Sequence, residues 1–200
     1  YEQVMGAVPF IRGVTISGGE PTIHHKKLVP LFKALKTQGL TCYLDSSGFF
    51  DYETTLPLID VTDKFLFDLK GQGLGLQTLC FERKNQAGKV PSQIIPTYQH
   101  IKSENLDRNL QNLAKLLPLG KIEEVRLVYL TEFFDSKALV KQVADLLTPY
   151  PDVAFKIIRV HTKGSRDPEG LTPFVPSNEQ VDELAKFAEC CGIKKVVKIY

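Results

Sequence analysis

Polar residues accompany the apolar runs of this sequence at five places along the chain. Each run is short and rich in β-branched or aromatic residues, which is typical of a buried strand. The polar groups that follow these runs, or in one case lie within one, are Ser17-Gly18-Gly19-Glu20, Asp45-Ser46-Ser47-Gly48, Asp68-x-Lys70-Gly71, Arg126 and His161-x-Lys163-Gly164. Carboxylates, hydroxyls and cations of this kind are the groups that orient a small charged ligand.

The segment Gly18-Gly19-Glu20-Pro21 is the most particular of the five. A strand-to-helix turn with a proline near the helix start accounts for one glycine. Two glycines also let a ligand lie close to the backbone, and a carboxylate accepts hydrogen bonds from an ammonium group. The segment therefore predicts a site for a ligand with a free amino group.

Each of the other groups alone favours a structural interpretation, as a turn, a helix cap or a surface ion pair. Five such groups, all expected at one rim of the predicted sheet, favour a shared site.

The elements that must position these residues alternate between strands and amphipathic helices. We expect strands at 13–17, 40–45, 64–69, 122–130, 153–160 and 194–200, and helices at 24–39, 52–58, 106–117, 136–147 and 178–192. This alternation indicates a parallel sheet with crossover helices, either an open doubly wound sheet or an arc of a (β/α) barrel. Either architecture places the chemistry beyond the carboxyl ends of the strands.

Composition limits the classes of function. The 200 residues are 43% hydrophobic and can bury a core, so one domain is expected. A net charge of +2, spread without long runs, predicts no nucleic-acid partner and no anionic membrane surface. No apolar stretch approaches the ~20 residues of a membrane span and no signal peptide is evident, so a cytoplasmic location is expected.

Five motifs carry a family resemblance. GVTISGGEP, LDSSG, FDLKG, EEVRLV and VHTKG, in this order and spacing, resemble the radical S-adenosylmethionine (SAM) enzymes that activate glycyl radical enzymes. The resemblance is to the pyruvate formate-lyase activating enzyme group, YjjW-type. It implies an α/β fold, a partial (β/α) barrel, with residues 1–200 forming strands two to six plus a terminal strand. The first β–α unit would be lacking in this chain, and 71–105 would be an irregular insertion loop.

The resemblance also assigns residues to cofactors. The residues implied to bind SAM are Gly18, Gly19 and Glu20 at its amino group, Asp45 and Ser47 as polar contacts, Lys70 near its carboxylate, Arg126 on the SAM side, and His161 near the ribose. A monovalent cation is implied at Asp45, Ser46 and Asp68, with the carbonyl of Leu66. The sequence departs from the family where LDSSG replaces D-[ST]-N-G, where YLTEFF replaces V-P-G, and in the 71–105 loop.

The largest departure concerns the [4Fe–4S] cluster. The family's C-x-x-x-C-x-x-C loop is absent, and Cys42, Cys80, Cys190 and Cys191 do not reproduce its spacing. We expect the cluster loop upstream of Tyr1, together with any ferredoxin-like insert, so this stretch holds no catalytic residue and alone is expected to be inactive.

The resemblance implies that the parent protein forms a 5′-deoxyadenosyl radical and abstracts hydrogen from a glycine of a partner glycyl radical enzyme. An electron donor such as flavodoxin or ferredoxin is also implied. Two alternatives stay open, a radical SAM enzyme with a small-molecule substrate and a cluster-free scaffold domain.

Overall fold

Six parallel strands form one sheet in the computed structural model, which describes all residues except 9, 70–106, 132–134 and 164–167. Each strand pairs in parallel with the next one along the chain, so the order across the sheet is β1 to β6 without a reversal. A doubly wound sheet would reverse its strand order near the middle. The sequential order therefore decides for an arc of a (β/α) barrel. The strands are β1 Gly13–Ile16, β2 Thr41–Ser46, β3 Lys64–Leu69, β4 Ile122–Tyr129, β5 Ala154–Arg159 and β6 Val196–Ile199.

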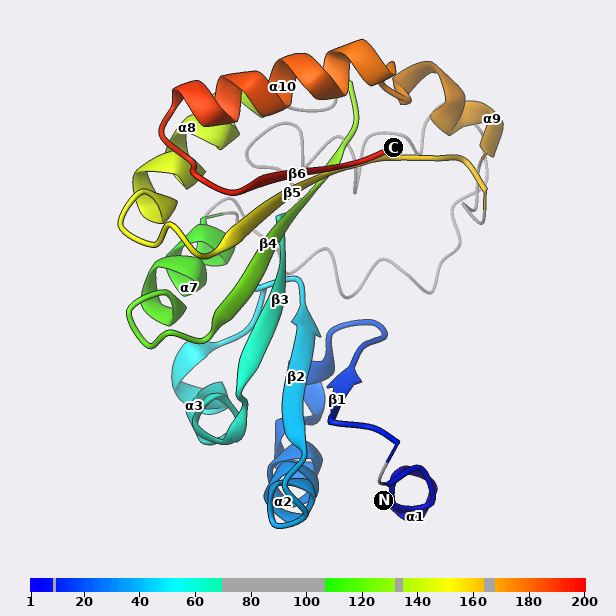
Figure 1. The fold of residues 1–200 in the computed structure, drawn as a ribbon, viewed down its shortest axis with the longest axis vertical. Coiled ribbons are helices and arrows are strands. Elements are labelled where there is room, and N and C mark those ends of the chain that lie inside the picture. The colour runs from blue at the N-terminus through cyan, green and yellow to red at the C-terminus, as the bar shows by residue number, and fades with distance from the viewer. Residues whose placement is uncertain (9, 70–106, 132–134, 164–167) are drawn as a thin grey trace.

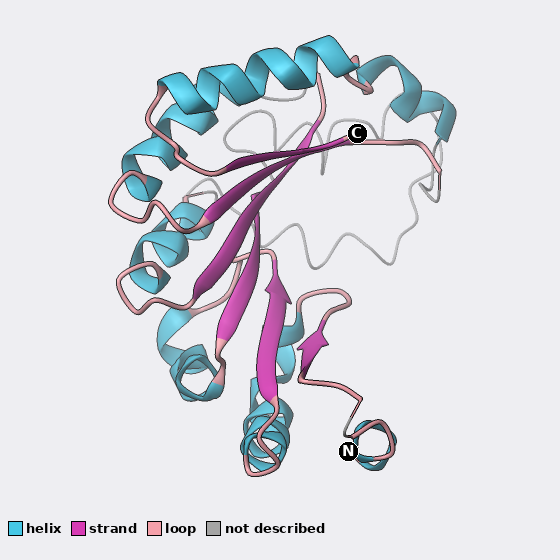
Figure 2. Ribbon diagram, viewed as in Figure 1, coloured by secondary structure: helices cyan, strands magenta, loops and turns pink. Residues whose placement is uncertain are grey.

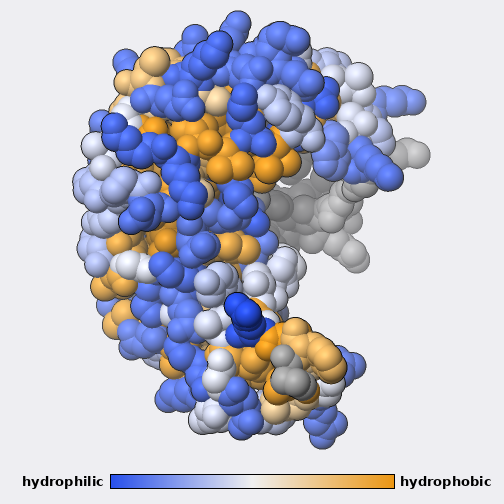
Figure 3. All heavy atoms as spheres, in the orientation of Figure 1, coloured by the Kyte–Doolittle hydropathy of each residue, from blue (hydrophilic) through white to orange (hydrophobic). Residues whose placement is uncertain are grey.

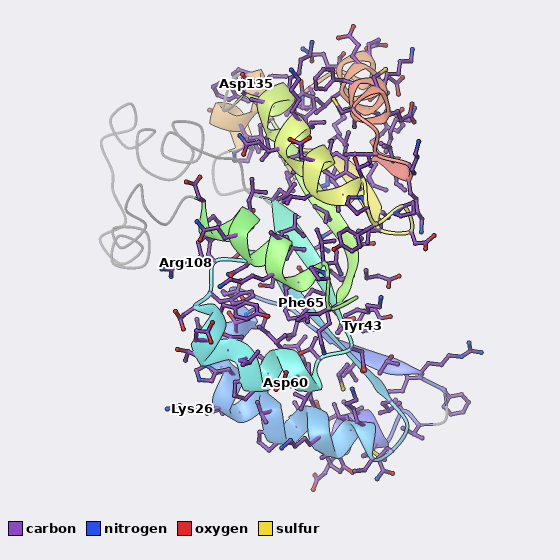
Figure 4. The ribbon with its side chains drawn as sticks, turned by 90° about the vertical axis from the view of Figure 1, so that its left-hand side faces the viewer. Lys26, Tyr43, Asp60, Phe65, Arg108 and Asp135 are labelled. Carbon is purple, nitrogen blue, oxygen red and sulfur yellow. The ribbon has the colours of Figure 1, made fainter. Side chains whose placement is uncertain are left out.

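Helices cover the outer, convex side of this arc (Figures 1 and 2). The crossover helices lie side by side along it, and Figure 4 shows Lys26 and Arg108, near the starts of two of them, toward the same side of the molecule. The helices and 3-10 turns are α1 Glu2–Met5, η1 Pro21–His24, α2 His25–Lys36, α3 Tyr52–Val61, α7 Arg108–Leu116, α8 Ser136–Leu147, α9 Pro168–Leu171, η3 Thr172–Phe174 and α10 Asn178–Cys190. Across the parts of the chain that the structure describes, no helix is long and apolar enough to cross a bilayer.

The core lies between the sheet and these helices. Successive strand residues point to opposite faces, so alternate side chains of β3 and β4 are buried against the helices. Phe65 and Phe67 of β3 and Val125 of β4 are fully buried, together with Phe32 of α2. Burial of one such side chain stabilises the fold by roughly 1.5–3 kcal/mol. The intervening residues of the same strands lie on the concave face, where Figure 3 shows the molecule hollowed.

Helix caps lie at the carboxyl ends of the strands, where the β–α loops lead into the helices. Asp51 accepts a hydrogen bond from the amide of Thr54 at 2.8 Å, and Asp135 accepts one from Ala138 at 2.9 Å. Ser177 and Gln180 form a reciprocal capping box at the start of α10. Such caps satisfy amides that the first helical turn leaves unpaired, and each contributes roughly 1 kcal/mol. The caps fix where each β–α loop ends.

The expected strands and long helices are confirmed, with boundaries shifted by a few residues. The helix expected from residue 24 begins instead with the 3-10 turn η1, because Glu20 caps Thr22 and Pro21 starts the turn. The helix expected at 52–58 continues to Val61 through Pro57. The short elements α9 and η3 were not expected, since three or four residues carry no periodic pattern. The 71–105 loop lies outside the described residues.

One prediction arises from the core. Burial, together with the nearby carboxylate of Asp63, raises the pKa of the Cys42 thiol to about 11. At pH 8 only about one Cys42 thiol in a thousand is then a thiolate. We expect Cys42 to resist alkylation by iodoacetamide in the native protein while the exposed Cys190 reacts, as measured by mass spectrometry of peptides. Rapid native labelling of Cys42 would contradict this packing.

Candidate functional site

A charged triad stands at the centre of the concave face. Nε of Arg126 in β4 donates to Oδ1 of Asp68 in β3 at 2.7 Å, and its Nη2 donates to Oδ1 of Asp45 in β2. The three side chains are only 17–24% exposed. Asp68 and Arg126 are register partners, so the parallel pairing places them side by side. The fold thus joins residues that are 81 positions apart in the sequence.

The triad keeps its arginine charged. Burial lowers the pKa of Arg126, but the charge of Asp68 and the contacts with Asp45 more than offset this, so the pKa lies above its ordinary value. The two carboxylates engage two of the five N–H groups of the guanidinium. The remaining N–H groups can donate to a ligand carboxylate or hydroxyl.

A second ion pair lies beside the triad on the same face. Nζ of Lys156 in β5 is 2.5 Å from Oε2 of Glu124 in β4. Lys156 is the register partner of Arg126, and Glu124 precedes Arg126 by two residues on the same side of β4. Carboxylates and cations therefore lie together on four neighbouring strands, β2 to β5. A ligand that carries both charges, such as an amino acid, suits such a surface better than a purely anionic one.

Glu20 joins two strand-end loops. Its carboxylate accepts hydrogen bonds from the hydroxyl of Thr22 at 2.6 Å and from the amide and hydroxyl of Ser47 at 2.8 and 2.6 Å. The hydroxyl of Ser46 donates to the same carboxylate at 3.0 Å. A carboxylate with two oxygens has about four good acceptor positions. Protein donors therefore satisfy Glu20 in this arrangement.

The glycine turn leaves open space in front of its backbone. Gly18 and Gly19 have φ values of +97° and +57°, which side chains with a Cβ adopt only at a cost. A Cβ built on either residue would meet no heavy atom of the described residues within 4 Å, apart from those of its own neighbours in the chain. Packing against the protein therefore does not require these glycines. Their backbone is accessible to a ligand.

The predicted site residues fall into two neighbouring groups. Asp45, Asp68 and Arg126 meet on the concave face, while Glu20 draws Ser46 and Ser47 to the glycine loop. The exposed His161 lies two residues beyond the end of β5. Lys70 lies outside the described residues.

The three residues expected at a monovalent cation have protein partners in this structure, and a cation there stays a prediction. Ser46 follows Asp45 in β2, so its side chain points to the opposite face, where it is buried and bonded to Glu20. The carboxylates of Asp45 and Asp68 are both paired with Arg126. Within the described ranges no three His, Cys, Asp or Glu side chains are grouped as for a metal ion.

The described cysteines do not fit an iron–sulfur cluster. Cys42 is buried in β2, while Cys190 and Cys191 are neighbours at the end of α10. A [4Fe–4S] cluster of the expected kind needs three thiolates around one site.

Sequence reasoning missed two further residues of the site region. Asn109 and Asn112 of α7 are 1% and 2% exposed and donate to carbonyl groups of the β2–α3 loop. In the sequence they are two polar letters of an amphipathic helix. Two asparagines three residues apart, on the face that also carries Leu113 and Leu116, were the available signal.

A sequential parallel arc, with paired charges on its concave face, defines a partial (β/α)-barrel fold, whose active sites lie toward the carboxyl ends of the strands. Comparisons with known proteins narrow this class. A protein of Haemophilus influenzae, provisionally named a glycyl-radical enzyme activating enzyme, is 69% identical over 199 residues, covering 100% of this chain and 76% of that protein. The pyruvate formate-lyase 2-activating enzyme of Escherichia coli is 26% identical over 192 residues, covering 92% of this chain and 59% of that enzyme.

The fold is also found among solved structures. The crystal structure of a domain of pyruvate-formate lyase-activating enzyme from Bacteroides vulgatus superposes with a TM-score of 0.62, at 18% identity, over 93% of this chain and 98% of that one. No protein-family model matches the chain. On the strength of the 69% identical relative, the chain belongs to the activating enzymes of glycyl-radical enzymes, a group of radical SAM enzymes.

Proposed function

We propose that this chain forms the SAM-binding part of an activating enzyme that generates a glycyl radical on a partner enzyme. The observation that carries the proposal is the pairing of Arg126 with Asp45 and Asp68. The loop with the open backbone of Gly18 and Gly19 is joined to this strand, because Glu20 accepts a hydrogen bond from Ser46, the residue after Asp45. The methionine end of SAM has an ammonium group, a carboxylate and a sulfonium. Backbone and carboxylate acceptors suit the two positive groups of SAM, and the cation of Arg126 suits its carboxylate.

Each group of the site has a role in this proposal. The backbone of the turn at Gly18 and Gly19 would meet the SAM amino group, because no Cβ stands in front of it. Arg126 would hold a carboxylate or hydroxyl with the N–H groups that Asp45 and Asp68 leave free. Roles of Lys70 at the carboxylate and of His161 at the ribose stay predictions.

Glu20 receives a different role from the one expected. Its carboxylate is already satisfied by Thr22, Ser46 and Ser47, so direct contact with the amino group would require it to give up protein donors. We infer that Glu20 fixes the glycine turn against the β2–α3 loop. Ser47 is likewise engaged by Glu20, and a contact from its hydroxyl to SAM would compete with this bond.

SAM bound here would supply the 5′-deoxyadenosyl group that abstracts hydrogen from a glycine of the partner. The described residues contain no group of three cysteines that could hold the cluster, and its position upstream of Tyr1 stays a prediction. The inactivity of this stretch alone, a flavodoxin or ferredoxin as electron donor, a cytoplasmic location and the single-domain organisation with a 71–105 insertion stay predictions.

Electron paramagnetic resonance tests the proposal against its two alternatives. We expect the whole protein, mixed anaerobically with SAM, a reductant and the glycyl radical enzyme of its own genome, to produce the doublet of a glycyl radical. Omission of SAM should abolish the signal. Cleavage of SAM without a glycyl radical would favour a small-molecule substrate, and absence of both would favour a scaffold domain.

A further inference from the structure

Two buried asparagines of α7 hold the β2–α3 loop and the end of β3. Nδ2 of Asn109 donates to the carbonyl of Ser47 at 2.6 Å and to that of Asp68 at 2.9 Å. Nδ2 of Asn112 donates to the carbonyls of Gly48 and Phe50, both at 2.8 Å. Each side-chain amide thus uses both N–H groups on backbone carbonyls.

Asparagine at these positions is unfavourable for the helix itself. It has a lower helix propensity than leucine, and burial of an amide costs free energy unless it is hydrogen-bonded. Asn109 and Asn112 nevertheless occupy the buried face of α7, beside Leu113 and Leu116. The hydrogen bonds to the loop offset this cost, because buried carbonyl groups without a partner are themselves costly.

The two asparagines differ in what they join. Asn112 binds two carbonyls of one loop, whereas Asn109 links that loop to the end of the neighbouring strand β3. The residues whose carbonyls Asn109 binds are Ser47, two positions after Asp45, and Asp68 itself. Asn109 therefore connects the two backbone segments whose carboxylates hold Arg126.

The loop lies directly against Asn109. A Cβ at Gly48 would come within 2.7 Å of Nδ2 of Asn109 and 2.3 Å of the Phe67 ring, so the contact leaves no room for a larger residue. On its other side the loop is held by Glu20, which accepts from the amide of Ser47 at 2.8 Å. The peptide groups that flank Ser47 are thus fixed from two directions, by the carboxylate of Glu20 and the amide of Asn109.

We propose that Asn109 is a positioning residue of the SAM site, which sets the separation of Asp45 and Asp68 and thereby the orientation of Arg126. This inference rests on the proposed function. Asn112 supports the same loop without contacting β3 and serves as a matched control. Loss of Asn109 should weaken SAM binding, whereas loss of Asn112 should mainly loosen the loop.

The test compares Asn109→Ala, Asn109→Asp and Asn112→Ala in the whole protein. Three quantities are measured: the affinity for SAM by equilibrium dialysis, the stability to urea, and amide hydrogen exchange at residues 46–50. We expect both alanine variants to lose stability to a similar extent, because each loses two hydrogen bonds. Only the Asn109 variants should lose SAM affinity, by roughly tenfold or more.

Asn109→Asp adds a readout that a purely structural role would not move. An ionised aspartate cannot donate to the carbonyls of Ser47 and Asp68, while a protonated one donates once. SAM affinity of this variant, normalised to the wild type at each pH, should therefore recover partly as the pH is lowered, and that of Asn109→Ala should not.

Equal SAM affinities of folded Asn109→Asp and Asn112→Ala would overturn the positioning role while leaving the proposed function intact. A wild-type protein that does not bind SAM would overturn the proposed function, and with it this inference.

Discussion

Replacement of Arg126 with methionine is expected to lower the free energy of unfolding by roughly 2–4 kcal/mol and to weaken SAM binding at least about tenfold. The substitution leaves the carboxylates of Asp45 and Asp68, which are 24% and 17% exposed in the wild type, without the cation between them. Removal of one partner from a partly buried ion pair costs more than the pair itself contributes, because the charge left behind is poorly solvated. Urea unfolding and equilibrium dialysis with SAM measure the two effects.

Lys156→Met is the matched control for this substitution. It also removes one cation from the concave face, but it leaves a single carboxylate, Glu124, unpaired. Lys156 has a 30% exposed side chain, so water compensates more of the loss. We expect a smaller loss of stability than for Arg126→Met and little change in SAM affinity. Equal losses of SAM affinity in Lys156→Met and Arg126→Met would contradict a role of the triad in SAM binding.

Arg126→Lys separates charge from geometry. A lysine keeps the positive charge but lacks the planar fork that lets Arg126 donate to two carboxylates at once. Stability should be partly restored relative to Arg126→Met. SAM affinity should stay low, because the free N–H groups of the guanidinium are lost.

Much of this fold could be predicted from the sequence. Alternating short strands and amphipathic helices indicated five β–α units, and all six expected strands are present. Local patterns cannot choose between an open doubly wound sheet and a barrel arc, since both use the same units. The sequential strand order, which decides for the arc, follows from packing between distant segments.

The site could be predicted only in part for the same reason. The motifs at the strand ends were visible, and the rule for parallel sheets placed them on one edge. The grouping of Asp45, Asp68 and Arg126 depends on the register of three strands. The hydrogen bonds that Glu20 accepts and the two that Asn109 donates depend on side-chain directions in the folded chain. The spacing of the asparagines marks them as residues of the apolar helix face but does not name their partners.

Gly19→Val and Asp45→Ala are the second pair of changes with a large expected effect. A Cβ at Gly19 would meet no atom of the described residues within 4 Å, so we expect the valine side chain to enter the space proposed for SAM. The positive φ of +57° adds a strain of roughly 1–3 kcal/mol, which the fold should tolerate. Asp45→Ala removes one acceptor of the site and one of the two partners of Arg126. Both variants should stay folded.

Each variant has a matched control. Gly39→Val reproduces the backbone strain of Gly19→Val, and Asp63→Ala reproduces the loss of a paired carboxylate in Asp45→Ala, but neither lies in the proposed SAM site. Gly39 has a φ of +75° and, like Gly19, open space at its Cβ. It precedes β2 and so lies at the amino-terminal ends of the strands, opposite the glycine turn. Asp63, which pairs with Lys36 at 2.6 Å, lies at the same ends of the strands. Gly39→Val and Asp63→Ala therefore impose comparable local costs away from the strand-end loops. We expect SAM cleavage by both controls to match the wild type.

The most direct test of the SAM site is the reductive cleavage of SAM to 5′-deoxyadenosine and methionine by the whole protein. We expect the wild type, Gly39→Val and Asp63→Ala to form both products at similar rates. Gly19→Val and Asp45→Ala should form neither, although their circular dichroism spectra match the wild type. Normal cleavage by both Gly19→Val and Asp45→Ala would contradict the assignment of this strand-end site to SAM.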